Sequence, residues 1–133
     1  MRIVRPWIAT TLVVVAILYL TLWPDPVPDT GITLFEGVDK VVHAIMFGGL
    51  TLTLIFDSTL SEKGARPSWC LTLWFALIST IFGAAIEFMQ RAMGLGRAFS
   101  WWDIVADGVG ALVAVCLGAI AVKLARKCIK SAD

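Results

Sequence analysis

The chain has 133 residues, of which 59% are hydrophobic and 16% are charged, and its mean hydropathy is +0.86. Soluble domains are roughly 45–50% apolar, so this composition excludes an ordinary soluble domain and predicts a single-domain, all-α integral membrane protein. A formal net charge of +1 provides no electrostatic basis for binding nucleic acid, and no nucleic-acid partner is expected.

Four apolar segments predict four transmembrane helices within one transmembrane domain, residues 1–133. The first, at about 7–23, lies between two tryptophans and is followed by Pro24. A basic and then apolar N-terminus also fits a secretion signal, but the sequence TLWPDP lacks a small-residue cleavage pattern, which favours a retained anchor. The remaining spans are predicted at about 41–56, 69–89 and 101–122.

The basic residues orient the predicted bundle. Eight of the 11 lysines and arginines fall on the side of both termini, and only Lys40, Arg91 and Arg97 fall on the other. Because cytoplasmic loops carry the excess of Lys and Arg, this asymmetry predicts an N-in/C-in topology. Cys70 and Cys128 are then expected near the cytoplasmic face.

Seven polar or charged residues lie at the ends of three of these spans, all on the predicted extracytoplasmic side. They are Asp39, His43, Glu87, Gln90, Arg97, Asp103 and Asp107. Spacings of four, three and four residues place each within-span pair on one helix face. Such side chains are costly in lipid, and where they occur they line a cavity, pair with one another or contact a substrate.

Rows of small residues continue two of these polar faces. Ser79 and Gly83 precede Glu87, whereas Gly110, Ala114 and Gly118 follow Asp107. Since small residues at this spacing allow helices to approach closely in lipid, the polar faces are expected to turn inward.

Structural interpretations remain open for each polar residue. Asp103 follows Ser100 by three positions, as in a capping box, and Asp39 fits a first-turn residue that complements the helix dipole. His43 is the only histidine, and a core histidine bonded to a carboxylate fits the sequence as well as a catalytic one. An ion-pair network explains Glu87 equally well.

No metal or cofactor is expected from the sequence. One histidine with three acids is a poor match to the ligand sets of zinc sites. The chain also has no glycine-rich phosphate loop, no nucleophile elbow and no HExxH pattern.

Three blocks with polar and small residues occur in order along the chain: DKVVHAIMFGGL (39–50), GAAIEFMQ (83–90) and GRAFSWWDIVADGVGAL (96–112). Together these blocks resemble the VanZ-like family of small bacterial membrane proteins. The family pattern resembles DKxxHxxxF, ExxQ and GRxxsxxDxxxNxxG, and this chain departs from it at Asp107, where asparagine is expected. The resemblance implies a multi-pass protein of the bacterial cytoplasmic membrane, in a family whose name member is associated with low-level resistance to teicoplanin.

Two functional hypotheses follow. In the first, the polar site binds or modifies an amphiphile in the outer leaflet: a lipid head group, a lipid-linked cell-wall precursor or a lipoglycopeptide such as teicoplanin. In its binding form Arg97 holds an anionic group, with Gln90, Asp103 and Asp107 as further substrate contacts. In its catalytic form His43 is a general base, oriented by Asp39 or Glu87.

The second hypothesis is a scaffold or partner subunit in which the polar residues only lock the helix bundle. A transporter is a weaker third idea, because four short spans show no broken-helix pair. Whether the chain is an enzyme, and its oligomeric state, are left open by the sequence.

Overall fold

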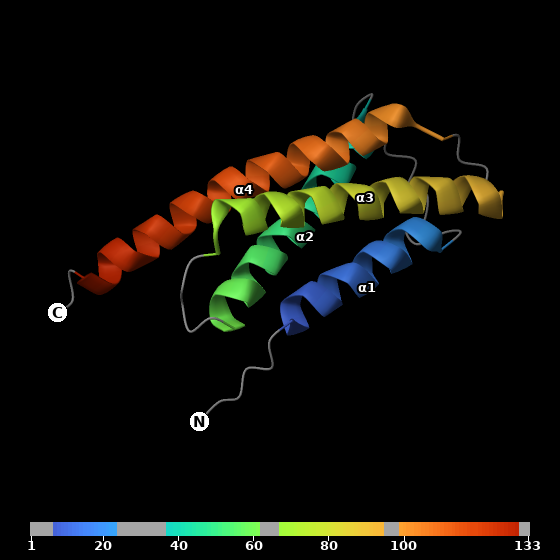
Figure 1. The fold of residues 1–133 in the computed structure, drawn as a ribbon. Helices are drawn as coiled ribbons and strands as arrows, with labels where there is room; N and C mark the ends of the chain where they lie inside the picture. The colour runs from blue at the N-terminus through green and yellow to red at the C-terminus, as the bar shows by residue number, and fades with distance from the viewer. Residues whose placement is uncertain (1–6, 24–36, 62–66, 95–98, 131–133) are drawn as a thin grey trace.

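The computed structural model describes residues 7–23, 37–61, 67–94 and 99–130, with side chains described as far as residue 124. Every regular element in these residues is a helix: α1 (Ile8–Leu22), α2 (Val38–Ser61), α3 (Trp69–Met93) and α4 (Trp101–Lys130). The helices form an elongated bundle in which α1 and α3 run in one direction and α2 and α4 in the other (Figure 1).

The expected class of all-helical membrane protein is confirmed. In the described residues α2, α3 and the Trp101–Leu124 part of α4 are long and apolar enough to cross a membrane. The described part of α1 is apolar but has 15 residues, which makes it about 22 Å long against a hydrocarbon core of about 30 Å. A fourth span therefore remains a prediction.

Three of the helices extend beyond the apolar segments that predicted them. The second begins at Val38 and ends at Ser61, so that Asp39 and Lys40 lie in its first turn and Asp57 lies within it. The third continues to Met93 and the fourth to Lys130. The reason is that hydropathy marks the part of a helix inside lipid, whereas helical hydrogen bonding continues through the polar turns at each end.

Local signals in the sequence account for the helix ends near the polar residues. The Ser68 hydroxyl accepts a hydrogen bond from the Leu71 N–H at 3.2 Å and starts α3. Gly94 ends α3 in the left-handed conformation, φ 64°, which glycine adopts without strain. The Ser100 hydroxyl accepts from the Asp103 N–H at 3.3 Å, which is the serine half of the capping box considered from the sequence. The reciprocal bond to Asp103 is not made, because the Ser100 N–H donates to Glu87.

The closest packing in the bundle is between α2 and α4, with α3 packed on α4 and, less extensively, on α2. A Cβ added at Gly110 would collide with the backbone carbonyl of Ala44, and one added at Gly48 would lie 2.9 Å from the Gly110 oxygen. The glycines thus bring the two backbones together, and Ala114 and Gly118 are also buried. The expected inward orientation of the small-residue rows is confirmed.

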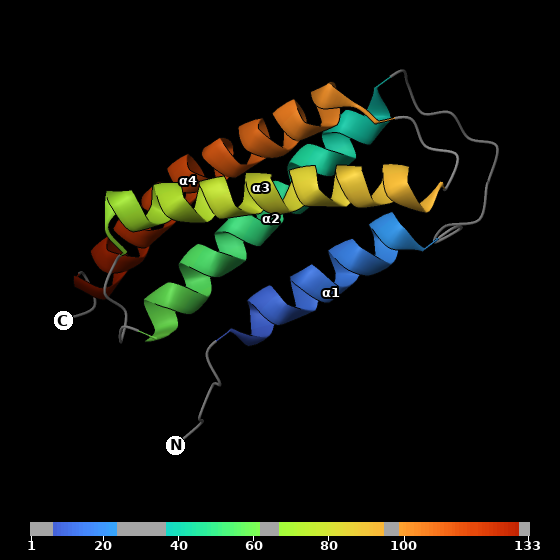
Figure 2. The same cartoon turned by 45° about the vertical axis from the view of Figure 1, so that its right-hand side comes forward.

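Helix α1 is the peripheral member of the bundle. It packs on α2 and slightly on α3, and in the described residues it makes no packing contact with α4 (Figure 2). Ile17 joins Phe47, Leu50 and Ile86 in a buried apolar cluster. The first turn of α1 is held by Asp57 of α2, whose Oδ2 accepts a hydrogen bond from the Thr10 N–H at 2.9 Å.

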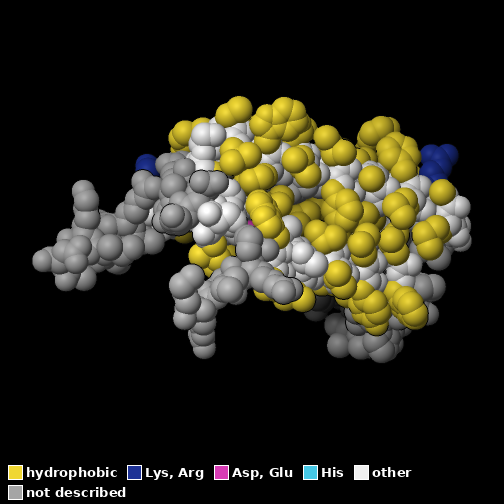
Figure 3. Space-filling view, turned by 60° about the horizontal axis from the view of Figure 1, so that its bottom comes forward, with side chains coloured by type: hydrophobic (Ala, Val, Ile, Leu, Met, Phe, Trp, Pro, Cys, Tyr) yellow, Lys and Arg dark blue, Asp and Glu magenta, His cyan; other side chains and the backbone are white. Residues whose placement is uncertain are grey.

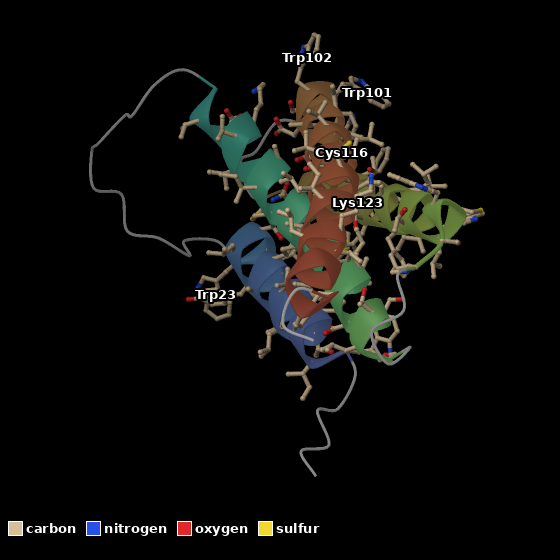
Figure 4. The ribbon with its side chains drawn as sticks, turned by 90° about the vertical axis from the view of Figure 1, so that its left-hand side faces the viewer. Trp23, Trp101, Trp102, Cys116 and Lys123 are labelled. Atoms are coloured by element: carbon tan, nitrogen blue, oxygen red, sulfur yellow. The ribbon has the colours of Figure 1, made fainter. Side chains whose placement is uncertain are left out.

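The outer surface is mostly hydrocarbon. Figure 3 shows one face of the molecule on which hydrophobic side chains cover most of the area outside the grey residues. Trp101 and Trp102 project away from the start of α4, each 69% exposed (Figure 4). Tryptophans in such positions are typical of the head-group level of a membrane.

Candidate functional site

The centre of the candidate site is His43 on α2, which is buried between α3 and α4. Its Nδ1 atom lies 3.0 Å from Oδ1 of Asp107 on α4, and Asp107 is completely buried. When Asp107 is ionised its carboxylate accepts from the Nδ1–H group, and in a neutral imidazole the free lone pair is then on Nε2. The contact thus orients the imidazole ring.

Two further buried carboxylates face the other nitrogen of the same ring. Nε2 of His43 lies 3.9 Å from Oε1 of Glu87 on α3 and 4.0 Å from Oδ2 of Asp103 on α4. Both distances exceed hydrogen-bond length. Three helices therefore contribute to one group, which we call the acidic-histidine cluster: His43, Glu87, Asp103 and Asp107.

The cluster is closed at the end of the bundle by the start of α4. The Ser100 N–H donates to Oε2 of Glu87 at 3.2 Å, and the Ser100 hydroxyl caps the same helix at Asp103. Oδ1 of Asp103 is buried without a hydrogen-bond partner, since Nζ of Lys40 lies 3.6 Å away, at ion-pair rather than hydrogen-bond distance. Lys40 also forms a 3.0 Å ion pair with Asp39.

Apolar and small residues pack against the cluster on the side of the bundle interior. The ring of Phe47, one turn along α2 and completely buried, stacks on His43 with the ring centroids 6.1 Å apart. Oδ2 of Asp107 has no hydrogen-bond partner and lies against Gly83, where an added Cβ would collide with it. Gly83 is therefore the residue that makes room for the Asp107 carboxylate.

A comparison with protein families decides the classification. The VanZ/LLP1 family model matches residues 6–122. The chain belongs to the VanZ/LLP1 family. It matches no curated protein and no solved structure. The matched range contains all four members of the acidic-histidine cluster, so the site lies within the part of the chain that defines this VanZ-like protein.

The VanZ-like motif residues divide into those inside the cluster and those outside it. Gln90 is buried, but its Nε2 donates to the Thr21 carbonyl at 2.8 Å and so ties α3 to α1. The Asp39 side chain is 56% exposed and pairs with Lys40. The carboxylate that hydrogen bonds His43 is that of Asp107, whereas Asp39 and Glu87 were the orienting groups considered from the sequence. Arg97 lies outside the described residues.

Sequence reasoning missed three contributors to this VanZ-like site. Lys40 was considered from the sequence only as one of three basic residues on the side away from the termini, yet its ammonium group lies between Asp39 and Asp103. The backbone role of Ser100 toward Glu87 has no sequence signal, because the two residues belong to different helices. Gly83 was expected only in a packing row, and its position four residues before Glu87 is the signal that could have placed it beside the cluster.

Proposed function

We propose that this VanZ-like protein binds an amphiphile in the extracytoplasmic leaflet, with the acyl chain along α2 and α4 and the polar head group at the acidic-histidine cluster. The observation that supports this most directly is an apolar groove between α2 and α4 that begins at Lys40 and Trp102. Lys40 lines this groove, and its ammonium group also lies 3.6 Å from Asp103 of the cluster.

The groove has the shape expected for one hydrocarbon chain. Its volume is about 580 Å³, within the roughly 300–1,000 Å³ of small-ligand sites. Its lining includes large side chains such as Ile45 and Val109 together with the small residues Ala44, Gly48 and Gly110. Gly48 and Gly110 have no side chains to fill the space where α2 and α4 meet. The same glycines that let the two backbones approach therefore also leave the groove open.

The length of the groove matches one leaflet. On α2 it extends from Lys40 to Leu52, which is about 18 Å along the helix axis. Half of a hydrocarbon core is about 15 Å thick. An acyl chain inserted from the Lys40 end therefore stays within the leaflet on that side, as the chain of a lipid or of a lipidated antibiotic does.

Lys40 connects the groove to the cluster. Its side chain is 41% exposed, and its ammonium group is already shared between Asp39 and Asp103. An anionic head group can replace the exposed Asp39 carboxylate as the partner of Lys40 at small cost, because exposed ion pairs contribute little. The same head group then lies beside Asp103 and within reach of the buried cluster.

Phospholipids, lipid-linked cell-wall precursors and lipoglycopeptides such as teicoplanin share this chemistry of an acyl chain joined to a polar, anionic group. A role in antibiotic resistance would follow from binding the last of these. In a catalytic version, Nε2 of His43 accepts a proton from the bound head group while Asp107 holds the ring. Glu87 then supplies the second carboxylate facing that nitrogen.

The groove is tested by filling it. A Cβ at Gly49 has no atom within 4 Å, so Gly49→Leu adds a side chain to the groove without a clash in the fold. We expect native mass spectrometry of the detergent-purified variant with added phosphatidylglycerol to show at least a tenfold loss of bound lipid. The matched control is Ile81→Phe, which adds bulk at a 58% exposed position of α3. Equal lipid binding by Gly49→Leu and wild type would overturn the proposal.

The polar part of the site is tested by conservative substitutions. His43→Gln, Glu87→Gln and Arg97→Lys keep side-chain size, so folded and extractable protein is expected. If the site handles a head group, these variants lose teicoplanin tolerance or lipid selectivity while their Tm in detergent stays near that of wild type. Retained function in all three folded variants would show that the acidic-histidine cluster does not bind the head group.

A scaffold without ligand chemistry is the second candidate, and specific contacts favour it. His43 to Asp107, Gln90 to the Thr21 carbonyl, and Thr51 to Ser79 at 3.0 Å each join two helices by a buried hydrogen bond. A purely structural cluster predicts that Tm and function fall together in the same substitutions. The Gly49→Leu variant separates the two candidates, because it leaves all three hydrogen bonds intact.

The proposed orientation has its own test in intact cells. With both termini in the cytoplasm, the exposed Cys70 at the start of α3 lies on the cytoplasmic side. A membrane-impermeant maleimide should leave wild type unlabelled and should label an Asp39→Cys variant, whose position is at the other end of the bundle. Labelling of wild type at Cys70 would reverse the orientation.

A further inference from the structure

We propose that the acidic-histidine cluster binds one divalent transition-metal ion, with zinc as the preferred ion, through Nε2 of His43, Oε1 of Glu87 and Oδ2 of Asp103. This inference does not depend on the amphiphile, because it concerns metal binding by the protein alone. It also revises the sequence-based expectation of no metal.

The geometry of the three atoms is that of a metal site rather than of a hydrogen-bonded network. All three ligand atoms lie within 4.8 Å of one another, and the imidazole nitrogen is 3.9 and 4.0 Å from the two carboxylate oxygens. Two ligands about 2.1 Å from a tetrahedral zinc ion lie about 3.4 Å apart. The two distances from His43 would shorten by about half an ångström, and the two carboxylate oxygens, at most 4.8 Å apart, by up to about 1.4 Å. Rotation of the two carboxylate groups brings their oxygens toward the ion.

The orientation of His43 is an independent indication of a ligand. Metal-binding histidines commonly donate their second ring N–H to a carboxylate, which fixes the tautomer and directs the free lone pair at the ion. Asp107 makes this contact at 3.0 Å from a completely buried position. With Nδ1 bonded to Asp107, Nε2 is the ring nitrogen that lies near the carboxylates of Glu87 and Asp103.

Asp103 provides the second indication. It is 8% exposed, yet its Oδ1 has no hydrogen-bond partner and its Oδ2 lies 4.0 Å from the imidazole. Buried carboxylates without hydrogen bonds are costly unless a cation compensates their charge. Among the described residues, Lys40 is the ammonium group near the three cluster carboxylates, and it also pairs with Asp39. With Lys40 counted toward Asp103, the charges of Glu87 and Asp107 remain, and a divalent ion would balance these two.

The donor set indicates which ion binds. One imidazole and two carboxylates suit zinc or manganese, whereas an all-oxygen site would favour magnesium or calcium. Three protein ligands are also the number in zinc sites that keep a fourth position for water or a polar ligand. From the sequence, one histidine with three acids was a poor match to zinc ligand sets. The fold brings three of these donors, each from a different helix, close together.

Metal content of the purified protein tests the proposal. Detergent-solubilised protein is stripped with a chelator, incubated with zinc chloride or manganese chloride, desalted, and analysed by inductively coupled plasma mass spectrometry. We expect about one zinc ion per chain for wild type, with zinc retained over manganese. In competition with a colorimetric zinc indicator, Asp107→Asn should bind about 10–100-fold more weakly, as for other residues that orient a metal-bound histidine.

The ligand substitutions are Glu87→Gln and Asp103→Asn, and each should lose more affinity than Asp107→Asn does. The matched control is Asp57→Asn, which changes a buried carboxylate at the other end of the bundle and should bind zinc like wild type. Wild type without zinc, or folded Glu87→Gln and Asp103→Asn variants that bind zinc like wild type, would overturn the proposal.

X-ray absorption spectroscopy of zinc-loaded wild type keeps the test decisive if the ligand variants do not fold. The expected spectrum shows one imidazole and oxygen neighbours at about 2.0–2.2 Å. A sulfur shell at about 2.3 Å would assign the ion to a thiol such as the exposed Cys70 or Cys116, and so would refute the cluster as the site. A spectrum with oxygen neighbours but no imidazole would do the same.

Discussion

The bundle buries carboxylates at both of its ends, and the two ends hold them in different ways. Asp57 accepts a hydrogen bond from the Thr10 N–H, where the N-terminus of α1 favours a negative charge. At the other end Asp107, Asp103 and Glu87 come from two helices and all face one imidazole. A carboxylate that caps a helix has a complete structural role, whereas three carboxylates around one ring have more charge than the fold requires.

The Asp57 end thus holds a structural polar contact, whereas the acidic-histidine cluster at the other end is a candidate site. Substitutions at the Asp57 end should change stability alone. Substitutions at the cluster end should change zinc and lipid binding beyond any change in stability.

Gly110→Ala should disrupt the cluster end most strongly. The added Cβ would collide with the Ala44 carbonyl, next to His43, and would push α2 and α4 apart. Overpacking of this kind costs about 1–3 kcal/mol. We expect a clearly lower Tm in detergent together with loss of zinc binding.

The control for that variant is Gly108→Ala, whose Cβ would meet Thr80 at an ordinary 3.6 Å. It should retain the Tm of wild type or exceed it, because alanine favours the helix. A Gly110→Ala protein as stable as Gly108→Ala would contradict the close backbone approach of α2 and α4.

Asp57→Ala should destabilise the protein without affecting the site. Loss of a helix-capping side chain costs about 1 kcal/mol, and here the Thr10 N–H loses its acceptor. The measurement is Tm in detergent together with zinc content, with Asp57→Asn retaining part of the stability because its amide oxygen still accepts. Reduced zinc content in a folded Asp57→Ala protein would show that the two ends are not independent.

Thr51→Val should have a smaller effect, because it removes a single hydrogen bond between α2 and α3. Such bonds contribute about 0.6 kcal/mol on average in a membrane protein. A double-mutant cycle with Ser79→Ala measures the coupling directly. A coupling near zero would mean that the two hydroxyls contribute nothing to helix association.

Asp39→Asn should have the smallest effect on stability. The Asp39 carboxylate is largely exposed and pairs only with the neighbouring Lys40 among the described residues. Exposed ion pairs are weak and screened by salt. Tm and zinc content are expected to match those of wild type, while the freed Lys40 should bind phosphatidylglycerol more strongly. A large loss of zinc would place Asp39 in the site after all.

Much of the candidate site could be predicted from the sequence because it depends on helical periodicity. The four-residue spacing of Asp103 and Asp107 and the order of the spans bring His43, Glu87 and both aspartates to one end of the bundle. Spacing cannot say which carboxylate meets which nitrogen. That pairing depends on the rotation of α4 about its axis, which is set where Gly110 meets Ala44.

Other features depend on contacts that no local pattern encodes. In the sequence, Asp57 begins a polar segment after the second apolar run. It is buried and caps the first turn of α1 only because α1 packs on α2. Gln90 belongs to the same motif as Glu87, yet one turn of helix directs it to α1 instead of the cluster. The groove follows from the closeness of α2 and α4, which are not neighbours in the chain.

The hydrogen bond between His43 and Asp107 also bears on how the chain enters the membrane during synthesis. An aspartate raises the cost of inserting a helix, by up to about 2.5–3.5 kcal/mol at the helix centre, and α4 carries two aspartates in its first two turns. Because α2 and α3 are translated first, the imidazole of His43 is already present when α4 emerges. We therefore expect α4 to insert against α2, which is synthesised earlier and carries the histidine that bonds Asp107. The order of the helices along the chain then favours correct assembly of the bundle.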